Sequence, residues 1–197
     1  TLVVREGEIH GLVGENGAGK STIMNQLYGM QRPTSGTIKV FGNEVQIHSP
    51  KDAIALGIGM VHQHFMLLPS LTVAENVVLG IEPMKNGFFD FKKAVEMTRE
   101  VAEKYKFDID PLMKVADLSV GQMQKVEIMK VLIKGAKIII MDEPTAVLTP
   151  QETEELFEQL ILLRENGHSI IFISHKLEEV KRICTRVTVL RHGYCLG

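Results

Sequence analysis

Cysteine and tryptophan are scarce in this sequence, whose 197 residues hold no tryptophan and two cysteines, Cys184 and Cys195. Two cysteines are too few for a disulfide framework, so we expect a reducing environment in which both side chains pack rather than do redox chemistry. The densest apolar runs, 138–141 and 170–173, have the length of strands and fall short of the roughly 18 to 20 residues that span a membrane. The first residues show neither a signal-peptide pattern nor an initiator methionine, and we expect the chain to be part of a longer protein.

Neither sign of charge is in excess. Lysine and arginine number 22, aspartate and glutamate number 24, and the formal net charge is −2. A chain without a basic excess lacks the electrostatic footprint of a protein that covers nucleic acid with its whole surface. No internal repeat, low-complexity stretch or G-x-G-x-x-G string occurs, so a dinucleotide site has no support. The 45% of hydrophobic residues are enough for a buried core.

Strand-like and helix-like segments alternate along the chain. Short apolar runs predict strands, and amphipathic or capped segments predict the helices between them. Strands are expected at 8–13, 58–62, 137–141, 169–173 and 187–190, a hairpin at 37–47 with its bend at Gly42–Asn43, and helices at 20–29, from Asp90 through Tyr105, at 121–134 and at 151–165. This alternation is typical of an α/β fold with a mostly parallel sheet covered on both faces.

The strand signal fades between about residue 66 and residue 134 and then returns. We therefore expect 66–134 to form a helical subdomain that is inserted into the sheet domain. The core would consist of 1–65 together with 135–197.

A glycine-rich string follows the first predicted strand. Residues 14–21 read GENGAGKS and match G-x-x-x-x-G-K-[S/T] between a strand and a helix, where a phosphate-binding loop is expected. Glycines let backbone N–H groups approach phosphate oxygens, and the helix N-terminus favours anions. Lys20 can reach the β- and γ-phosphates, and the Ser21 hydroxyl can bind Mg²⁺. The predicted nucleotide-binding residues are Gly14, Glu15, Asn16, Gly17, Ala18, Gly19, Lys20, Ser21 and Thr22.

Two carboxylates end the predicted strand in the string IIIMDE at 138–143. They would lie at the carboxyl edge of the sheet, where open α/β sheets bind ligands. Asp142 suits Mg²⁺, and Glu143 suits a general base that deprotonates an attacking water. An Asp-Glu pair alone is more often two solvated acids at the start of a loop. The phosphate loop upstream on the same sheet favours the functional interpretation.

Three further elements complete a series. Gln63 follows the strand at 58–62, the string LSVGQ occupies 118–122, and His175 follows the strand at 169–173. A phosphate loop, a lone glutamine, L-S-x-G-Q, an acidic strand end and a lone histidine, in this order, resemble the ATP-binding cassette (ABC) ATPases. The resemblance covers nearly the whole chain. It implies a P-loop NTPase fold with an N-terminal β-hairpin region, and hydrolysis of ATP with Mg²⁺.

The resemblance also implies roles for single residues. Gln63 would sense Mg²⁺ and the γ-phosphate, and His175 would hydrogen-bond the γ-phosphate and position the water. The L-S-x-G-Q signature would close over the ATP of a second copy, which suits a helix N-terminus. The implied catalytic residues are Glu143, His175 and Gln63, the metal ligands are Ser21, Gln63 and Asp142, and the signature residues are Ser119, Gly121 and Gln122.

The strings MVHQHFML, LTVAENVVLG and DEPTAVLTPQE are similar to bacterial importer ATPases for simple sugars and nucleosides. This similarity implies an ATPase that sits peripherally at the cytoplasmic face of the cell membrane and energises uptake of a small solute, a sugar or a nucleoside. The implied partners are permease subunits, a second cassette and, indirectly, a solute-binding protein, with no nucleic acid. The second cassette would be either a tandem half of the same polypeptide, of which this chain would be most of the first cassette, or a second copy in a homodimer. Val120 replaces the usual first glycine of the signature, and Thr149 replaces the usual aspartate after the acidic strand. The adenine-stacking aromatic residue of the family has no counterpart before Gly14.

A soluble ABC-type ATPase that acts on nucleic acid or ribosomes is the alternative. Such relatives usually carry coiled-coil or basic insertions, whereas the insertion here is short and not strongly basic. A GTPase would need an N-K-x-D string, which does not occur. His62 and His64 flank Gln63 and could suggest a metal pair, but no nearby residue completes a ligand set, so we interpret them as strand-end residues.

Overall fold

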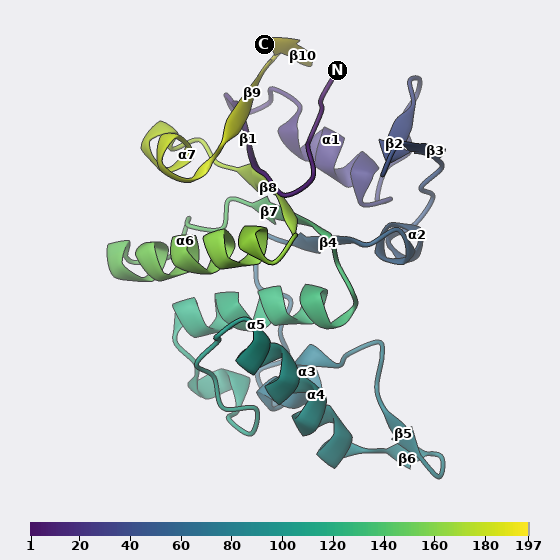
Figure 1. The fold of residues 1–197 in the computed structure, drawn as a ribbon, viewed down its shortest axis with the longest axis vertical. Helices are drawn as coiled ribbons and strands as arrows, with labels where there is room; N and C mark the ends of the chain where they lie inside the picture. Colours follow the sequence, from purple (N-terminus) through teal and green to yellow (C-terminus); the bar gives the residue numbers. More distant parts are fainter. Residues whose placement is uncertain (197) are drawn as a thin grey trace.

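A computed structural model describes residues 1–196 of the chain. Its centre is a six-stranded sheet with the order β10-β9-β1-β8-β7-β4 (Figure 1). All neighbouring strands are parallel except β10, which runs antiparallel to β9 at the edge. The strands are β1 (Ile9–Gly14), β4 (Ile58–Val61), β7 (Ile138–Asp142), β8 (Ser169–Ile173), β9 (Arg186–Arg191) and β10 (Tyr194–Leu196). The predicted α/β class with a mostly parallel sheet is confirmed.

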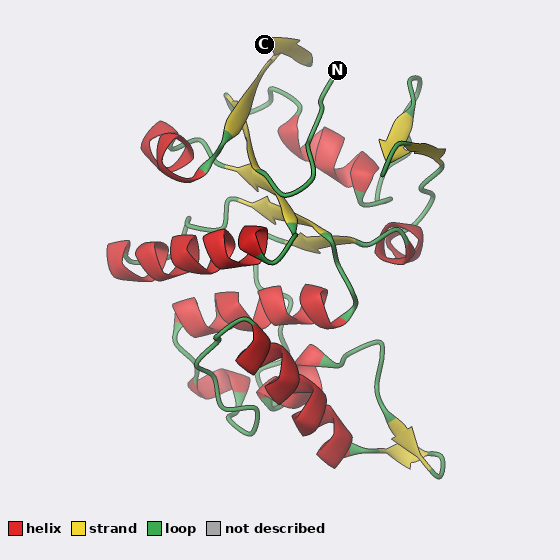
Figure 2. Ribbon diagram, viewed as in Figure 1, coloured by secondary structure: helices red, strands yellow, loops and turns green. Residues whose placement is uncertain are grey.

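Helices cover both faces of this sheet (Figure 2). Successive strand residues point to opposite faces, so Ile139 joins one buried cluster and Ile140 the other. The first cluster includes apolar residues of α5 (Val120–Ile133), α6 (Pro150–Glu165) and α7 (Leu177–Ile183). The second includes those of α1 (Lys20–Leu27), α2 (Pro50–Ala55) and the hairpin of β2 (Ile38–Val40) and β3 (Asn43–Val45). Continuous apolar strands are therefore explained by burial on both sides.

The segment between β4 and β7 lies at the end of the molecule away from both termini (Figure 1). It contains α3 (Val73–Val77), α4 (Phe91–Lys104), the short 3₁₀ helix η1 (Val115–Asp117) and α5. Asp90 caps α4, because its side chain accepts a hydrogen bond from Lys93 N. α5 contacts α3 and α4 on one side and β4 and α6 on the other. α5 therefore joins the helical segment to the sheet.

A buried hydrogen bond makes a second connection between these regions. The Tyr105 hydroxyl, directly after α4, lies 2.8 Å from Nε2 of His168, which precedes β8. Both residues are buried, and their rings meet edge to face. The pKa of His168 lies below its usual value because burial disfavours the charged ring. A neutral imidazole at this position can form the hydrogen bond with the Tyr105 hydroxyl without burying a charge.

The hairpin bend differs from the prediction by one residue. We expected Gly42–Asn43, but Val40 pairs with Asn43, so the bend consists of Phe41 and Gly42. Both bend residues have positive φ, 50° and 81°, as a tight hairpin of this kind requires. The residue types at 42–43 indicate a turn, whereas the register between β2 and β3 follows from burial of Val40 in the core.

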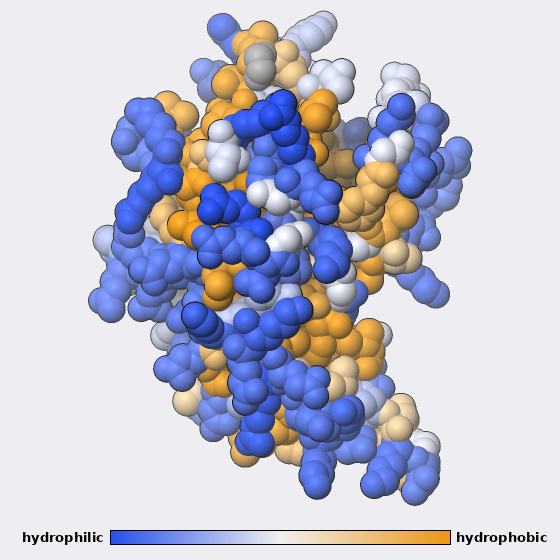
Figure 3. All heavy atoms as spheres, in the orientation of Figure 1, coloured by the Kyte–Doolittle hydropathy of each residue, from blue (hydrophilic) through white to orange (hydrophobic). Residues whose placement is uncertain are grey.

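Several short elements were not predicted. They are α2, α3, α7, β10 and a small hairpin of β5 (Met84–Lys85) and β6 (Phe88–Phe89) that lies inside the region where the strand signal fades. This hairpin protrudes at the end opposite the termini and exposes apolar side chains among hydrophilic ones (Figure 3). Elements of two to seven residues are too short for periodicity to reveal.

The two cysteines are free and partly buried, and each packs against one of the core clusters. Burial raises the pKa of the Cys184 thiol to about 12, which keeps it protonated and unreactive at neutral pH. In residues 1–196, no helix combines the length and apolar character needed to cross a membrane.

Candidate functional site

The glycine-rich loop joins β1 to α1 and has the conformation that its glycines permit. Gly17 and Gly19 have positive φ, 80° and 104°, and Gly19 is the N-cap of α1. At Gly14, a Cβ atom would lie 2.4 Å from the carbonyl oxygen of Leu190, so no larger residue fits without a backbone shift. The loop therefore ends directly at a helix N-terminus, where free backbone N–H groups attract an anion.

Lys20 is buried beneath this loop. Its Nζ atom donates hydrogen bonds to the carbonyl oxygens of Gly14 at 2.7 Å and Glu15 at 3.1 Å. The ammonium group is thus held at the first residue of the helix, inside the arc of the loop. A phosphate bound by the loop would find this positive charge within reach.

The loop forms one wall of a cleft of about 1040 Å³ at the carboxyl edge of the sheet. Residues that follow three different strands complete the cleft, as expected where parallel strands end together. Gln63 follows β4, Glu143 follows β7 and His175 follows β8, while Asp142 is the last residue of β7. The cleft thus brings together these four residues and Gly14, Glu15, Asn16, Gly17, Gly19, Lys20, Ser21 and Thr22. Ala18 is buried in the core beneath the loop.

Glu143 and His175 contact each other directly. Oε2 of Glu143 lies 2.8 Å from Nδ1 of His175. An ionised carboxylate can only accept, so Nδ1 of His175 is the donor in this contact. Glu143 has a φ of 49°, an unusual value for a non-glycine residue that is stable only where the surroundings enforce it. Strain of this kind often occurs where a side chain is held for chemistry.

Asp142 has a perturbed acidity. Burial and the neighbouring charge of Glu143 raise its pKa above the usual value, while His62 and Lys20 act in the opposite direction. Two adjacent carboxylates at a partly buried position repel each other, and a cation bound beside them would relieve that repulsion. Oxygen ligands from Asp142 and the Ser21 hydroxyl are of the type that Mg²⁺ prefers, so the residues of this cleft fit that ion.

The three signature residues lie outside the cleft, at the start of α5. Ser119 is the N-cap of α5 and forms a reciprocal capping box with Gln122. The backbone N–H of Gly121 donates to Oε1 of Glu152 at 2.9 Å, and a Cβ on Gly121 would come within 2.8 Å of that atom. A larger residue at Gly121 would therefore displace the carboxylate of Glu152 from this position. The first turn of α5 already interacts with one carboxylate of this chain.

Thr149 has a clear local role. It is the N-cap of α6 and forms a capping box with Glu152, whose carboxylate accepts from both the amide and the hydroxyl of Thr149. The same carboxylate therefore caps α6 and contacts α5. The T-x-x-E pattern at 149–152 is a signal from which sequence reasoning could have found the capping box of α6.

The two histidines beside Gln63 lie just after β4, which ends at Val61. The ring of His62 meets that of Tyr28 edge to face, with centroids 6.0 Å apart. Across residues 1–196, no group of three or more His, Cys, Asp or Glu side chains could hold a metal ion together.

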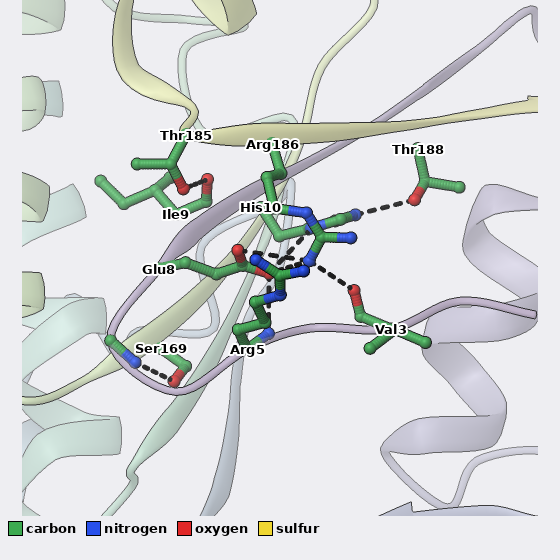
Figure 4. Close-up of polar contacts among 10 residues, drawn as sticks. Val3, Arg5, Glu8, Ile9, His10, Ser169, Thr185, Arg186 and Thr188 are labelled. Atoms are coloured by element: carbon green, nitrogen blue, oxygen red, sulfur yellow. Dashed lines mark hydrogen bonds and ion pairs between the residues drawn. The ribbon is translucent and has the colours of Figure 1, made fainter. Parts of the chain in front are cut away.

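A buried polar cluster at the start of β1 was not anticipated (Figure 4). His10 is fully buried, with Nδ1 3.1 Å from Glu8 Oε1 and Nε2 2.8 Å from Thr188 Oγ1. Burial alone would raise the pKa of Glu8, but the Arg5 amide, His10 and Arg186 together lower it. Burial lowers the pKa of His10. An ionised Glu8 and a neutral His10 satisfy every hydrogen bond of the cluster, which lies at the end of β1 opposite the glycine-rich loop.

Comparison with known proteins identifies the family. A model of the family described as ABC transporter matches residues 1–146. The chain is 54% identical over 192 residues to the guanosine import ATP-binding protein NupO of Bacillus subtilis, covering 98% of this chain and 38% of the relative. It is 49% identical over 224 residues to the glucose import ATP-binding protein TsgD13 of Haloferax volcanii, covering 100% of this chain and 41% of the relative. The chain thus spans about two fifths of the length of such relatives.

A solved structure has the same fold. It is described as the ADP conformation of an ATP-binding cassette of an ABC transporter, and it superposes with a TM-score of 0.87 at 26% sequence identity. The match covers all of this chain and 81% of the solved one. The predicted P-loop NTPase fold is confirmed, and binding of nucleotide by this fold is supported.

Proposed function

Because the chain belongs to the ABC transporter family, we propose that it is the ATP-binding and ATP-hydrolysing part of a membrane importer. One observation carries the proposal: Lys20, Gln63, Asp142, Glu143 and His175 line the same cleft, although up to 155 positions separate them along the chain. Relatives named for import of guanosine and of glucose suggest a small solute, a nucleoside or a simple sugar. The solute itself differs among these relatives, so this domain does not define it.

The loop residues 14–22 would bind the phosphates of ATP. Backbone N–H groups of Gly17 and of the first turn of α1 would donate hydrogen bonds to the phosphate oxygens, and Lys20 would supply a positive charge near the β- and γ-phosphates. Lys20 now donates to two carbonyl oxygens, and it can exchange these for phosphate oxygens with little movement. Positioning and charge neutralisation by these groups supply most of the catalysis of phosphoryl transfer.

Glu143 would act as the general base. Its carboxylate would accept a proton from the water that attacks the γ-phosphate, and His175 would orient that water and hydrogen-bond the γ-phosphate. The 2.8 Å contact between the two side chains fixes which oxygen of Glu143 is engaged by the imidazole. The other oxygen, Oε1, is then available for the water. Gln63 would face the same water and the metal from β4.

Mg²⁺ would supply neutralisation of the charge that develops on the phosphates. Ser21, Asp142 and Gln63 would hold it, the first two by oxygen atoms beside the loop and the third across the cleft. Ionised Asp142 suits this role, because a bound cation would counteract both the burial and the repulsion from Glu143 that raise its pKa.

A second cassette would complete the reaction. Ser119, Gly121 and Gln122 lie outside this chain's own cleft, and in our proposal they close over ATP held by the second cassette, with its signature closing over this one. We also propose the division into a core, residues 1–65 and 135–197, and a helical subdomain, residues 66–134. ATP binding and hydrolysis would close and open the pair of cassettes.

The remaining partners would be the permease subunits and, through them, a solute-binding protein, with the cassette attached to the cytoplasmic face of the membrane. The test is purification of the whole protein in mild detergent from its native cells, followed by mass spectrometry of what accompanies it. Multi-span membrane proteins and a solute-binding protein are the expected companions. Ribosomal proteins or nucleic acid without a membrane partner would instead support the soluble ABC-type ATPase.

A further inference from the structure

One carboxylate bridges the two loops that carry Glu143 and His175. Glu179 lies in α7, and its Oε2 atom accepts hydrogen bonds from the Thr145 hydroxyl at 2.7 Å and from the Ser174 hydroxyl at 3.1 Å. Thr145 comes two residues after Glu143, and Ser174 comes directly before His175. A single oxygen atom therefore joins the segment after β7 to the segment after β8.

The bridge is buried. Thr145 is 1% exposed and Ser174 is 0% exposed, and the side chain of Glu179 is 14% exposed. The other carboxylate oxygen of Glu179 pairs with Lys176 Nζ at 3.0 Å, and the same Nζ donates to the carbonyl oxygen of Thr145 at 3.3 Å. Without Glu179, two buried hydroxyls would lose their acceptor, and such groups are rarely left unpaired in native proteins.

The two loops need such a bridge because the sheet stops holding them together. The β7–β8 pairing ends at Asp142 and Ile173, followed by a hydrogen bond from Glu143 N to Ile173 O at 3.0 Å. Beyond that bond the chains separate into a turn and into the start of α7. Glu143 keeps a positive φ at this position, which requires support from its surroundings.

We propose that Glu179 is a positioning residue for ATP hydrolysis, an inference that rests on the function proposed above. Glu179 does not line the nucleotide cleft. It acts through Thr145 and Ser174, and it keeps Glu143 Oε2 and His175 Nδ1 within their 2.8 Å contact. A general base that shifts by about 1 Å can lose about a hundredfold in rate, so a residue that fixes its backbone contributes to turnover and not to nucleotide affinity.

The test is a comparison of two neighbouring glutamates in the whole protein. Glu179→Ala should lower kcat about 10- to 100-fold and change the KM for ATP by less than about threefold, because the phosphate loop is untouched. Glu178→Ala is the matched control, since that side chain is 88% exposed and its ion pair is with the exposed Lys181. Turnover of Lys20→Ala gives the background from any other ATP site. Equal kcat in the two alanine variants, or a loss of ATP affinity as large as the loss of kcat, would overturn the inference.

A second comparison separates positioning from general damage. If Glu179 acts through Glu143, then adding Glu179→Ala to Glu143→Gln should lower the remaining rate by less than about twofold, because the positioned group is already gone. An equal loss in both backgrounds would contradict the inference. If Glu179→Ala does not fold, Thr145→Val and Thr145→Ser replace it: the serine variant, which keeps the hydroxyl, should have the higher kcat, and equal rates would refute the role.

These outcomes also separate the two proposals. Unchanged hydrolysis in Glu143→Gln would refute the proposed mechanism itself. A large loss in Glu143→Gln together with normal turnover in Glu179→Ala would leave the mechanism intact and remove only the positioning role.

Discussion

Replacing Glu143 with glutamine isolates the chemistry of one carboxylate. Glutamine has nearly the same volume, and its carbonyl oxygen can still accept the hydrogen bond from His175 Nδ1, which lies 2.8 Å from Glu143 Oε2. What disappears is the ability to take a proton from water. General-base catalysis contributes about 10²- to 10⁴-fold in rate, which corresponds to about 2.7 to 5.5 kcal/mol of transition-state stabilisation. We therefore expect kcat for ATP hydrolysis to fall by that factor.

ATP affinity should survive this change, because the Glu143 side chain hydrogen-bonds His175, whereas phosphate binding is assigned to Lys20 and the glycine-rich loop. Removing a negative charge near the phosphates should also lower the raised pKa of Asp142 toward its usual value, which favours cation binding. Phosphate release at saturating Mg-ATP measures kcat, and equilibrium binding of labelled ATP measures affinity. Glu165→Gln is the control, since its side chain is 60% exposed and its partner Arg164 lies 3.8 Å away. Turnover within twofold of the unaltered protein would refute the general-base role.

The remaining predictions concern the loop, the helical segment and the buried cluster. Lys20→Ala should weaken ATP binding about 10- to 150-fold, since a charge-assisted hydrogen bond contributes about 1.5 to 3 kcal/mol, and unchanged affinity by calorimetry would contradict the loop assignment. Tyr105→Phe should destabilise the protein by about 1 to 3 kcal/mol in urea unfolding followed by circular dichroism, because it leaves buried His168 Nε2 unpaired, and a change below about 0.5 kcal/mol would refute this. The pKa of Glu8 is lowered in the folded protein, so the ionised side chain stabilises the fold at any pH above 4.5, the ordinary pKa of this group. This contribution is lost as the pH falls through the folded pKa, so Glu8→Gln should lose less stability than the unaltered protein on acidification. Parallel losses of stability in the two proteins would exclude the effect.

The sheet and the cleft could be predicted because their signals are local. The strands at 138–141 and 169–173 are short, β-branched and apolar, and the glycine-rich loop is defined by residue types at fixed spacing. Parallel strands end at one edge, so residues placed after different strands were bound to converge. Gln63 and His175 illustrate this, since each is an ordinary polar residue until its strand is known.

Other features depend on contacts that no local pattern reports. α2 and α3 are six and five residues long, too short for periodicity, although Ser49 and Thr72 do cap them through side-chain hydrogen bonds. The bridge from Glu179 to Thr145 and Ser174 spans 34 and 5 positions of the chain and depends on how α7 packs against the strand ends. A glutamate in the first turn of a helix is usually solvated.

The buried pair of Glu8 and His10 is an intermediate case. Their spacing of two residues places both on one face of β1, which the sequence does show. Their burial follows from Arg186 and Thr188 on the neighbouring strand, 178 positions away, and pairing over that distance could not be read from either segment alone.

The most direct test of the central claim is a structure of the whole protein with Mg²⁺ and a non-hydrolysable ATP analogue. The account predicts the triphosphate against residues 14–22, with Lys20 on the β- and γ-phosphates, the metal beside Ser21 and Asp142, and Glu143 facing the γ-phosphate. An empty glycine-rich loop at saturating nucleotide, or a nucleotide bound with its γ-phosphate away from Glu143, would contradict it.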